Sequence, residues 1–189
     1  MPVTKGVLMR LLISVAVVLS ALVALPLAAQ PFYCFGGSPQ FCQYLPDEGF
    51  DYNPSYWTFT GGSSRNTVTD PCYSGTTPAA TLAPGYGVFQ WVDTEDESEW
   101  AISLQVFFSD AGGTSADTVI VEITNVTLFN QTEQFYISAA DYGTCANIYI
   151  PLTNNYNDAS VRVKVWLDYE STMSSVAVDN ITFWGGPFI

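Results

Sequence analysis

GFDYNPSYWTFTGG (49–62) and SSVAVDNITFWGG (174–186) are the two stretches of this sequence that decide its predicted fold. The first is a turn of glycine, aromatic and acidic residues that runs into a strand carrying Trp57. The second alternates apolar with small or polar residues before it reaches Asp179-Asn180-Ile181, which is the pattern of a half-buried strand. We expect the two stretches to be the first and last strands of one β-sandwich and to pair at one end of it.

Apolar residues recur at every second position in the segments between these two stretches. The clearest cases are WAISLQVFF at 100–108 and VRVKVWLDY at 161–169. Clusters of glycine, serine, asparagine and aspartate separate the segments, as in SDAGGTSAD at 109–117. Many short alternating segments with such separators predict an all-β fold, an antiparallel β-sandwich of the jelly-roll type.

The N-terminus has the pattern of an export signal. Lys5 and Arg10 precede an apolar run at 11–25, and small residues follow it to Ala29. This pattern predicts a signal peptide over 1–29 and a secreted or cell-surface protein, with a retained membrane anchor as the alternative. We divide the remainder into an N-terminal arm at 30–48, rich in aromatic residues and cysteine, and a sandwich domain at 49–189.

The charge after the leader is strongly negative. Three basic residues, Arg65, Arg162 and Lys164, stand against 18 acidic ones, a formal charge of −15. Nucleic acids and anionic membranes attract clusters of lysine and arginine, so this balance argues against both as partners.

All four cysteines follow the leader, and an even number in an exported chain predicts two disulfides. Three pairings are possible. We favour Cys34–Cys42, which closes a short loop, and Cys72–Cys145, which ties distant segments together. A zinc site is not expected, because the chain has no histidine and no CxxC pair.

The two stretches at the ends of the predicted sandwich resemble those of jelly-roll carbohydrate-binding modules and of similar galactose-binding-like or MAM-type sandwiches. In that group a turn and strand of the form GFE…G…W…G are paired with a C-terminal strand of the form lDnV. The resemblance implies a structural calcium ion held by Asp51 and Asp179, with Glu48 as a helper. Carboxylate oxygens suit calcium chemically.

Aromatic side chains are the candidates for contacts with sugar rings, which stack on exposed aromatic faces. Trp166 alternates onto the same side of its strand as Arg162 and Lys164, so we expect it to be exposed. Trp91 and Tyr86 are further candidates. The sequence thus allows glycans as ligands.

Two sequons, Asn125-Val-Thr and Asn130-Gln-Thr, are the sites where we expect N-glycosylation if the host carries it out. A third, at Asn180, lies inside the last predicted strand and is expected to be less accessible.

Enzymatic activity is not expected. The absence of histidine excludes Ser-His-Asp and Cys-His catalytic mechanisms. The sequence also has no glycine-rich phosphate-binding loop, so an organic cofactor is not expected. The remaining scheme is the carboxylate pair of a glycosidase, for which Glu122 with Glu133 or Glu170 could be nominated. The glutamate-bearing strands typical of small xylanases and cellulases are not found.

Both ends of the predicted mature chain are apolar. Aromatic residues there could dock on a neighbouring subunit or fold back on their own sandwich; they are Phe32, Tyr33, Phe35, Trp184 and Phe188. We therefore expect first an extracellular structural or adhesive subunit that self-assembles into an oligomer or polymer by adding a strand to the next copy. The alternatives are a calcium-stabilised carbohydrate-binding protein and a small jelly-roll glycosidase.

Overall fold

The computed structural model describes residues 33–35, 41–51, 54–73, 75–108, 113–128 and 131–187. The predicted signal peptide at 1–29, Phe32, Asn130 and Phe188 lie outside the described residues. In the part of the chain that is described, no helix has the length and apolarity needed to span a bilayer.

The described residues form two antiparallel sheets, which confirms the predicted all-β sandwich. The seven-stranded sheet contains β1 (Tyr33–Phe35), β2 (Phe41–Gln43), β4 (Ser64–Thr69), β5 (Thr76–Leu82), β7 (Trp100–Phe108), β10 (Cys145–Pro151) and β12 (Val176–Gly185). The five-stranded sheet has the order β3 (Thr58–Phe59), β6 (Gly87–Asp93), β11 (Ser160–Leu167), β8 (Thr118–Asn125) and β9 (Gln131–Ser138). Two short turns complete the elements, the 3-10 turn η1 (Pro54–Tyr56) and α2 (Ala139–Tyr142).

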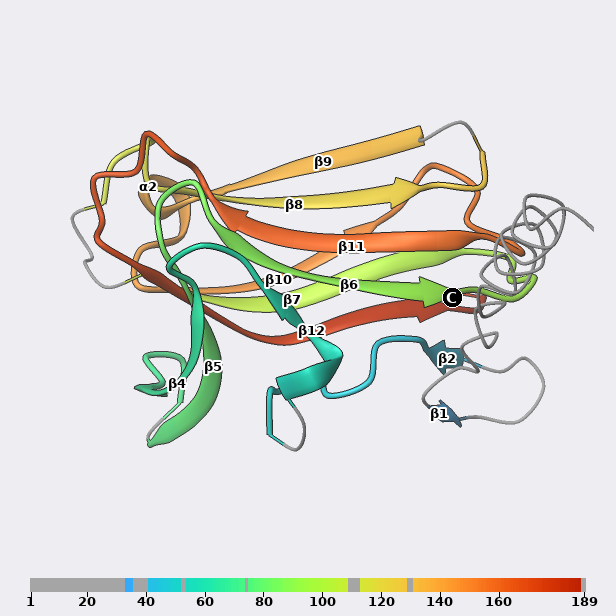
Figure 1. Cartoon of the computed structure of the whole chain (residues 1–189), viewed down its shortest axis with the longest axis horizontal. Coiled ribbons are helices and arrows are strands. Elements are labelled where there is room, and N and C mark those ends of the chain that lie inside the picture. Colours follow the sequence, from blue (N-terminus) through green and yellow to red (C-terminus); the bar gives the residue numbers. More distant parts are fainter. Residues whose placement is uncertain are drawn as a thin grey trace, which may run out of the picture.

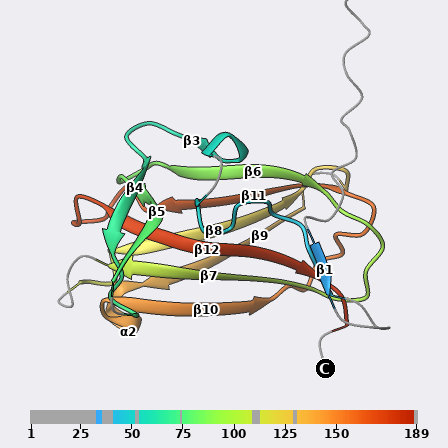
Figure 2. The same cartoon turned by 90° about the horizontal axis from the view of Figure 1, so that it is seen from below.

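Strand β12 is the centre of the larger sheet. It pairs with β7 along its length, and β7 pairs with β10. On its other side, the first half of β12 pairs with β5 and its last residues pair with β2. In Figure 1, β9, β8 and β11 lie above β12 and the β4–β5 hairpin extends away below it, and Figure 2 shows β12, β7 and β10 side by side.

The core lies between the two sheets and follows from the alternation seen in the sequence. In β11, Val161, Val163, Val165 and Leu167 are buried, whereas the residues between them are only partly buried. Their partners in β8 include Val119, Val121 and Ile123, all fully buried. Because strand side chains alternate between faces, the other positions of β11 must lie on the outside of the sandwich.

The two stretches that predicted the fold meet, but not as paired strands. Strand β3, in the first stretch, pairs with β6 in the five-stranded sheet, whereas β12 belongs to the seven-stranded sheet. They meet where Gly49 approaches Asp179 and Asn180, and the Ile181 amide donates at 3.0 Å to the carbonyl of Glu48, the residue just before the first stretch. The prediction that they pair is thus wrong: the chain crosses between the sheets after the turn at Gly49.

The strand that does pair with the end of β12 comes from the arm. Gln43 and Cys42 of β2 are opposite Trp184 and Gly185. Next along the chain, Tyr44 is buried against Trp100, with ring centroids 5.1 Å apart. The described part of the arm therefore folds back on its own sandwich and contributes to its core.

Both favoured disulfides are present. Cys34–Cys42 joins directly opposed residues of β1 and β2. Cys72–Cys145 joins the segment between β4 and β5 to the first residue of β10. Each bond thus ties a peripheral segment of the larger sheet to a neighbouring segment.

Asp117 joins two loops at the end of the sandwich where β8 begins. Its side chain is 1% exposed, and its oxygens accept hydrogen bonds from the Thr114 hydroxyl, from Ser171 and Thr172, and from the Met173 amide. Burial acts to raise the pKa of Asp117, but these hydrogen bonds outweigh it and hold the pKa well below its usual range.

Candidate functional site

The outer face of the five-stranded sheet carries the most distinctive set of side chains. We define this face by three rows of residues that the strand register places side by side. The rows are Trp91, Arg162, Thr124 and Thr132; then Phe89, Lys164, Glu122 and Gln134; then Gly87, Trp166, Ile120 and Tyr136.

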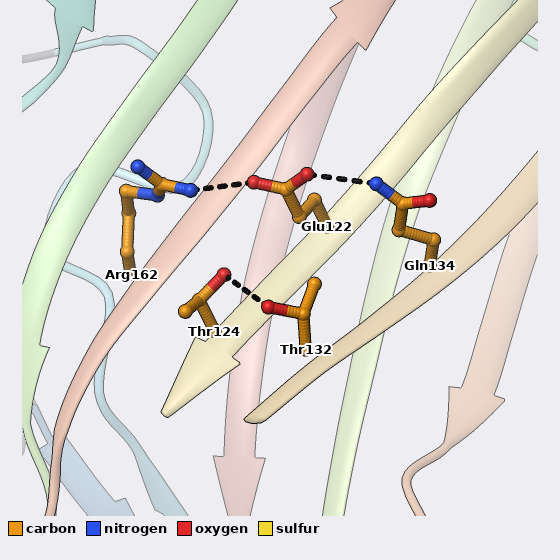
Figure 3. A network of polar contacts seen from close by, with 5 residues as sticks. All are labelled: Glu122, Thr124, Thr132, Gln134 and Arg162. Carbon is orange, nitrogen blue, oxygen red and sulfur yellow. Dashed lines mark hydrogen bonds and ion pairs between the residues drawn. The ribbon is translucent and has the colours of Figure 1, made fainter. Parts of the chain in front are cut away.

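A polar network fixes the centre of the outer face (Figure 3). Arg162 Nη2 lies 2.6 Å from Glu122 Oε1, and Gln134 Nε2 donates to Glu122 Oε2 at 2.8 Å. Thr124 and Thr132 share a hydrogen bond of 3.2 Å between their hydroxyls. Because these residues come from β11, β8 and β9, the network holds their side chains in one arrangement across three strands.

A shallow hollow of about 450 Å³ lies over this network. It is lined by Trp91, Glu122, Thr124, Val126, Thr132, Gln134 and Arg162. An aromatic side chain thus borders a floor of charged, amide and hydroxyl groups. This is the combination of apolar contact and fixed hydrogen-bonding groups that small-molecule sites use.

Exposed aromatic side chains lie on both sides of the polar network. The Trp91 side chain is 50% exposed, and the Arg162 guanidinium lies 5.8 Å from the centre of its ring. Tyr136, on the edge strand β9, is 63% exposed and donates its hydroxyl to Gln134 Oε1 at 3.1 Å. Each ring is therefore accessible and is also held by the network.

Trp166 lies on the outer face as expected, but it is half-buried. The Lys164 ammonium is 4.6 Å from the centre of its ring. The opposite position on β6 is Gly87, where an added Cβ would lie 2.1 Å from the Val165 carbonyl oxygen. Only glycine therefore allows β6 and β11 to approach at the position of Trp166.

Two nitrogen donors of the outer face are buried and have no hydrogen-bond partner. They are Trp166 Nε1 and Arg162 Nε. Buried donors in proteins are usually satisfied, so these two are exceptions among the described residues.

Tyr86 lies beside the outer face rather than in its rows. It immediately precedes β6 and is 47% exposed. Its ring covers Gly61, where φ is +54° and an added Cβ would lie 2.0 Å from the ring. Tyr86 therefore contributes an aromatic surface at the border of the sheet.

The three glutamates considered for glycosidase chemistry are not brought together. Glu122 is on the outer face, whereas Glu133 is opposite the buried Ile123 and accepts from the amides of Thr153 and Asn154. Glu170 accepts from the Tyr169 hydroxyl in a turn beyond β11. A carboxylate pair that flanks one bond, as glycosidases use, is not formed by these residues.

Two of the calcium ligands implied by the resemblance, Asp51 and Asp179, lie around Gly49 together with Asn180, which the resemblance did not name. Asp51 Oδ2, Asn180 Oδ1 and Asp179 Oδ1 lie 3.0, 3.6 and 3.7 Å from the position that a Gly49 Cβ would occupy. Burial raises the pKa of Asp179 to about 6, and the nearby Asp51 and Asp70 charges add to the rise, although hydrogen bonds from Thr77 and from the Asn180 amide oppose it. Carboxylate and amide oxygens and an excess of negative charge are what a hard cation such as calcium prefers.

Other observations show that few protein oxygens are free to bind a cation at this position. The described residues contain no group of three or more His, Cys, Asp and Glu side chains placed to hold a metal ion. The Glu48 carbonyl is used by Ile181, and Arg65 donates to the carbonyls of Phe50 and Asp51. A cation at Gly49 would thus need amide and water oxygens besides the two carboxylates.

The expectation that Asn125 is glycosylated is not compatible with its position in the structure. Its side chain is 0% exposed, its Nδ2 donates to the Asn155 carbonyl at 2.9 Å, and its Oδ1 accepts from the Leu128 amide at 3.0 Å. A glycan cannot be accommodated there in the folded chain. By contrast, Asn180 is exposed, at a bulge of β12 where its φ is 48°.

The residues nominated for assembly have varied positions. Tyr33 and Phe35 are in β1, which pairs with β2. Trp184 is a half-buried residue of β12, opposite Gln43. Within the described residues these positions belong to pairings inside one chain.

Sequence reasoning missed Tyr136, Gln134, Glu122 and the two threonines as parts of one outer face. The alternation of 161–169 placed Trp166 with Arg162 and Lys164, but it carried no information on which residues of β6, β8 and β9 lie beside them. What the sequence pattern lacks is the register between neighbouring strands, which decides which residues lie side by side.

Comparison with known proteins shows the fold. No family model matches the sequence, and no curated protein matches it significantly. A solved structure of TmCBM61 in complex with beta-1,4-galactotriose has a TM-score of 0.51 and 12% identity, over 75% of this chain and 97% of that one. The CBM22-1 xylan-binding domain of Paenibacillus barcinonensis Xyn10C has a TM-score of 0.51 and 11% identity, over 77% and 96%.

This chain has the jelly-roll fold of carbohydrate-binding modules. The resemblance seen in the sequence is therefore confirmed at the level of the fold. The same fold is found in the enzymatically active domain of bacteriophage CBA120 tailspike protein 4, with a TM-score of 0.50, 14% identity and 75% of this chain covered. This chain matches 20% of the length of that tailspike structure.

Proposed function

We propose that this protein binds carbohydrate through the outer face of its five-stranded sheet. The observation that carries the proposal is the exposed Trp91 ring beside the fixed Arg162–Glu122–Gln134 network. A sugar ring presents apolar C–H groups on its face and hydroxyl groups at its edge. Trp91 offers the stacking surface, and the network offers donors and acceptors for the hydroxyls.

The shared fold supports this proposal. The TmCBM61 and Xyn10C structures bind galactotriose and xylan according to their descriptions, and they are matched over nearly their whole length. A binding role also accords with the separation of Glu122, Glu133 and Glu170, which leaves the outer face without a glycosidase pair.

Self-assembly takes second place. The aromatic arm suggested a segment that docks on another copy, but β2 pairs with β12 and Tyr44 fills the core of the same chain. The described part of the arm thus packs against the sheet and the core of its own chain. Its aromatic residues therefore favour assembly less than the sequence suggested.

We also propose that a calcium ion joins Asp51, Asp179 and Asn180 around Gly49 and stabilises the fold. It would link the turn before β3 to the bulge of β12, where burial and, to a smaller extent, the nearby Asp51 and Asp70 charges raise the pKa of Asp179.

The test of carbohydrate binding is a glycan array followed by calorimetry with each glycan that binds. We expect Trp91→Ala to weaken binding at least about tenfold, since loss of a stacked aromatic ring removes contact worth about 1–3 kcal/mol. Tyr136→Ala should weaken it as well. Tyr149→Ala is the matched control, because Tyr149 is a strand tyrosine of the other sheet and is 55% exposed.

Two results would contradict the proposed face. One is a glycan whose affinity is unchanged in both Trp91→Ala and Tyr136→Ala. The other is a loss of binding in Tyr149→Ala that equals the loss in Trp91→Ala. Thermal melting of each variant separates altered binding from altered folding.

A further inference from the structure

Basic residues are rare in this protein, and their positions are informative. Beyond the predicted leader there are three, against 18 acidic residues in the chain. Arg65 donates to the backbone carbonyls of Phe50 and Asp51 and so serves the fold. The other two, Arg162 and Lys164, are successive outward residues of β11 and lie at the centre of the outer face.

The acidic partner on this face is fully engaged. Both oxygens of Glu122 are used, one by Arg162 and the other by Gln134. Within the described ranges no carboxylate lies at ion-pair distance from Lys164, although Glu122 is its neighbour in the register. The Lys164 ammonium rests on the Trp166 ring instead. The charged side chains of the outer face therefore have a net positive charge, although the chain as a whole is strongly negative.

The unsatisfied groups of the face have the same character. Trp166 Nε1 and Arg162 Nε are both donors, and the Lys164 ammonium on the Trp166 ring is a third. The first two are buried, whereas Lys164 is only partly buried, so its ammonium is the donor of the three that a ligand rich in acceptors can bind. Charged acceptors make the stronger hydrogen bonds with such donors.

We propose that the ligand of the outer face is an acidic glycan, whose carboxylate or sulfate group is bound by Lys164 beside Trp166. This inference rests on the proposed carbohydrate binding at the same face and adds the chemical class of the sugar. The acidic groups elsewhere on the protein repel such a polymer, but at about 0.1 M salt their effect is screened beyond roughly 10 Å. Contact with Lys164 then decides the affinity.

The test compares charged probes with their neutral counterparts by calorimetry at 0.1 M salt. Oligogalacturonate against its methyl ester reports on carboxylate, and dextran sulfate against dextran reports on sulfate. We expect one acidic probe to bind at least about tenfold more tightly than its neutral counterpart. The probe pair that shows the difference identifies the acidic group.

Two Lys164 variants make the assignment specific. Lys164→Gln should remove most of the difference in affinity between the acidic probe and its neutral counterpart, whereas Lys164→Arg should retain the difference because it keeps the charge. Equal affinity for charged and neutral probes, or a preference that survives Lys164→Gln, would overturn the inference.

The same measurements distinguish failure of the acidic ligand from failure of the proposed carbohydrate binding. Binding of neutral glycans that Trp91→Ala abolishes, with no tighter binding of either acidic probe, would uphold the binding face and reject the acidic ligand. Failure of every glycan to bind the unmutated protein would reject both.

Discussion

At the scale of single residues, Asp117 shows how one carboxylate can hold two loops. Its hydrogen bonds reach Thr114 on one loop and Ser171, Thr172 and Met173 on the other. The side chain is nearly inaccessible, so water cannot replace these partners. Removal of the carboxylate would leave several buried donors unpaired, which costs about 1–3 kcal/mol for each affected group.

We predict that Asp117→Ala lowers the free energy of unfolding by about 3 kcal/mol at pH 7. The depressed pKa of Asp117 also gives a sign for pH. The ionised carboxylate stabilises the folded chain fully above the unfolded pKa of about 3.9, and this contribution is lost as the pH falls toward the lower folded pKa.

Urea unfolding of the protein and of Asp117→Ala at pH 7 and pH 3 checks both statements. The difference in unfolding free energy between the two proteins should be smaller at pH 3. A difference that stays constant would show that the charge of Asp117 is not what holds the loops.

At the scale of elements, the two disulfides act on loops of very different length. Cys34–Cys42 spans 8 residues of sequence, and Cys72–Cys145 spans 73. A cross-link restricts the unfolded chain more when it closes a longer loop. The longer link also fastens β10, an edge strand, to the segment between β4 and β5.

We therefore predict that the double variant C72A/C145A loses more stability than C34A/C42A. The loop lengths give losses of about 4 and about 2.5 kcal/mol at 25 °C. Urea unfolding of both double variants measures the order. A larger loss for C34A/C42A would show that the β1–β2 hairpin matters more for the native state than loop entropy allows.

At the scale of the whole molecule, the proposed cation would join segments 130 residues apart in the chain, the turn at Gly49 and the bulge at Asp179. We predict that millimolar calcium raises the melting temperature by several degrees relative to EDTA, since a ligand at 100 times its dissociation constant stabilises by about 2.7 kcal/mol. Scanning calorimetry is the measurement.

Asp51→Ala and Asp179→Ala should each abolish this rise. Asp51 is exposed, so its loss tests the cation site without opening the core. Asp141→Ala, in α2, is the control for an exposed acid outside the site. An unmutated protein that melts at the same temperature in calcium and in EDTA would contradict the cation site.

Much of the architecture could be predicted from the sequence because it depends on local alternation. The pattern of 161–169 correctly gives a strand with valines inside and Trp166 outside. The position of β3 could not be predicted in this way, because nothing in 49–62 states which sheet its strand joins. The burial of Asn125 depends on the loop that contains Asn155, which is distant in sequence.

The candidate site was predictable only in part for the same reason. Trp166 and Trp91 were nominated, and both lie on the outer face. Their polar neighbours Glu122 and Gln134 come from strands whose order and register are set by packing of the whole core. The pairing of Arg162 with Glu122 follows only when β11 is placed beside β8.

The pairing of β2 with the end of β12 has a mechanical consequence. Cys42 of β2 lies opposite Gly185, the last residue of β12, so the flank before β2 and the flank after β12 leave this pair at the same end. Tension applied to the two flanks would load the hydrogen bonds of this antiparallel pair one after another, starting from the outermost. The pair would open like a zipper at low force, while the five-stranded sheet, which bears none of the load at that stage, would keep its outer face intact.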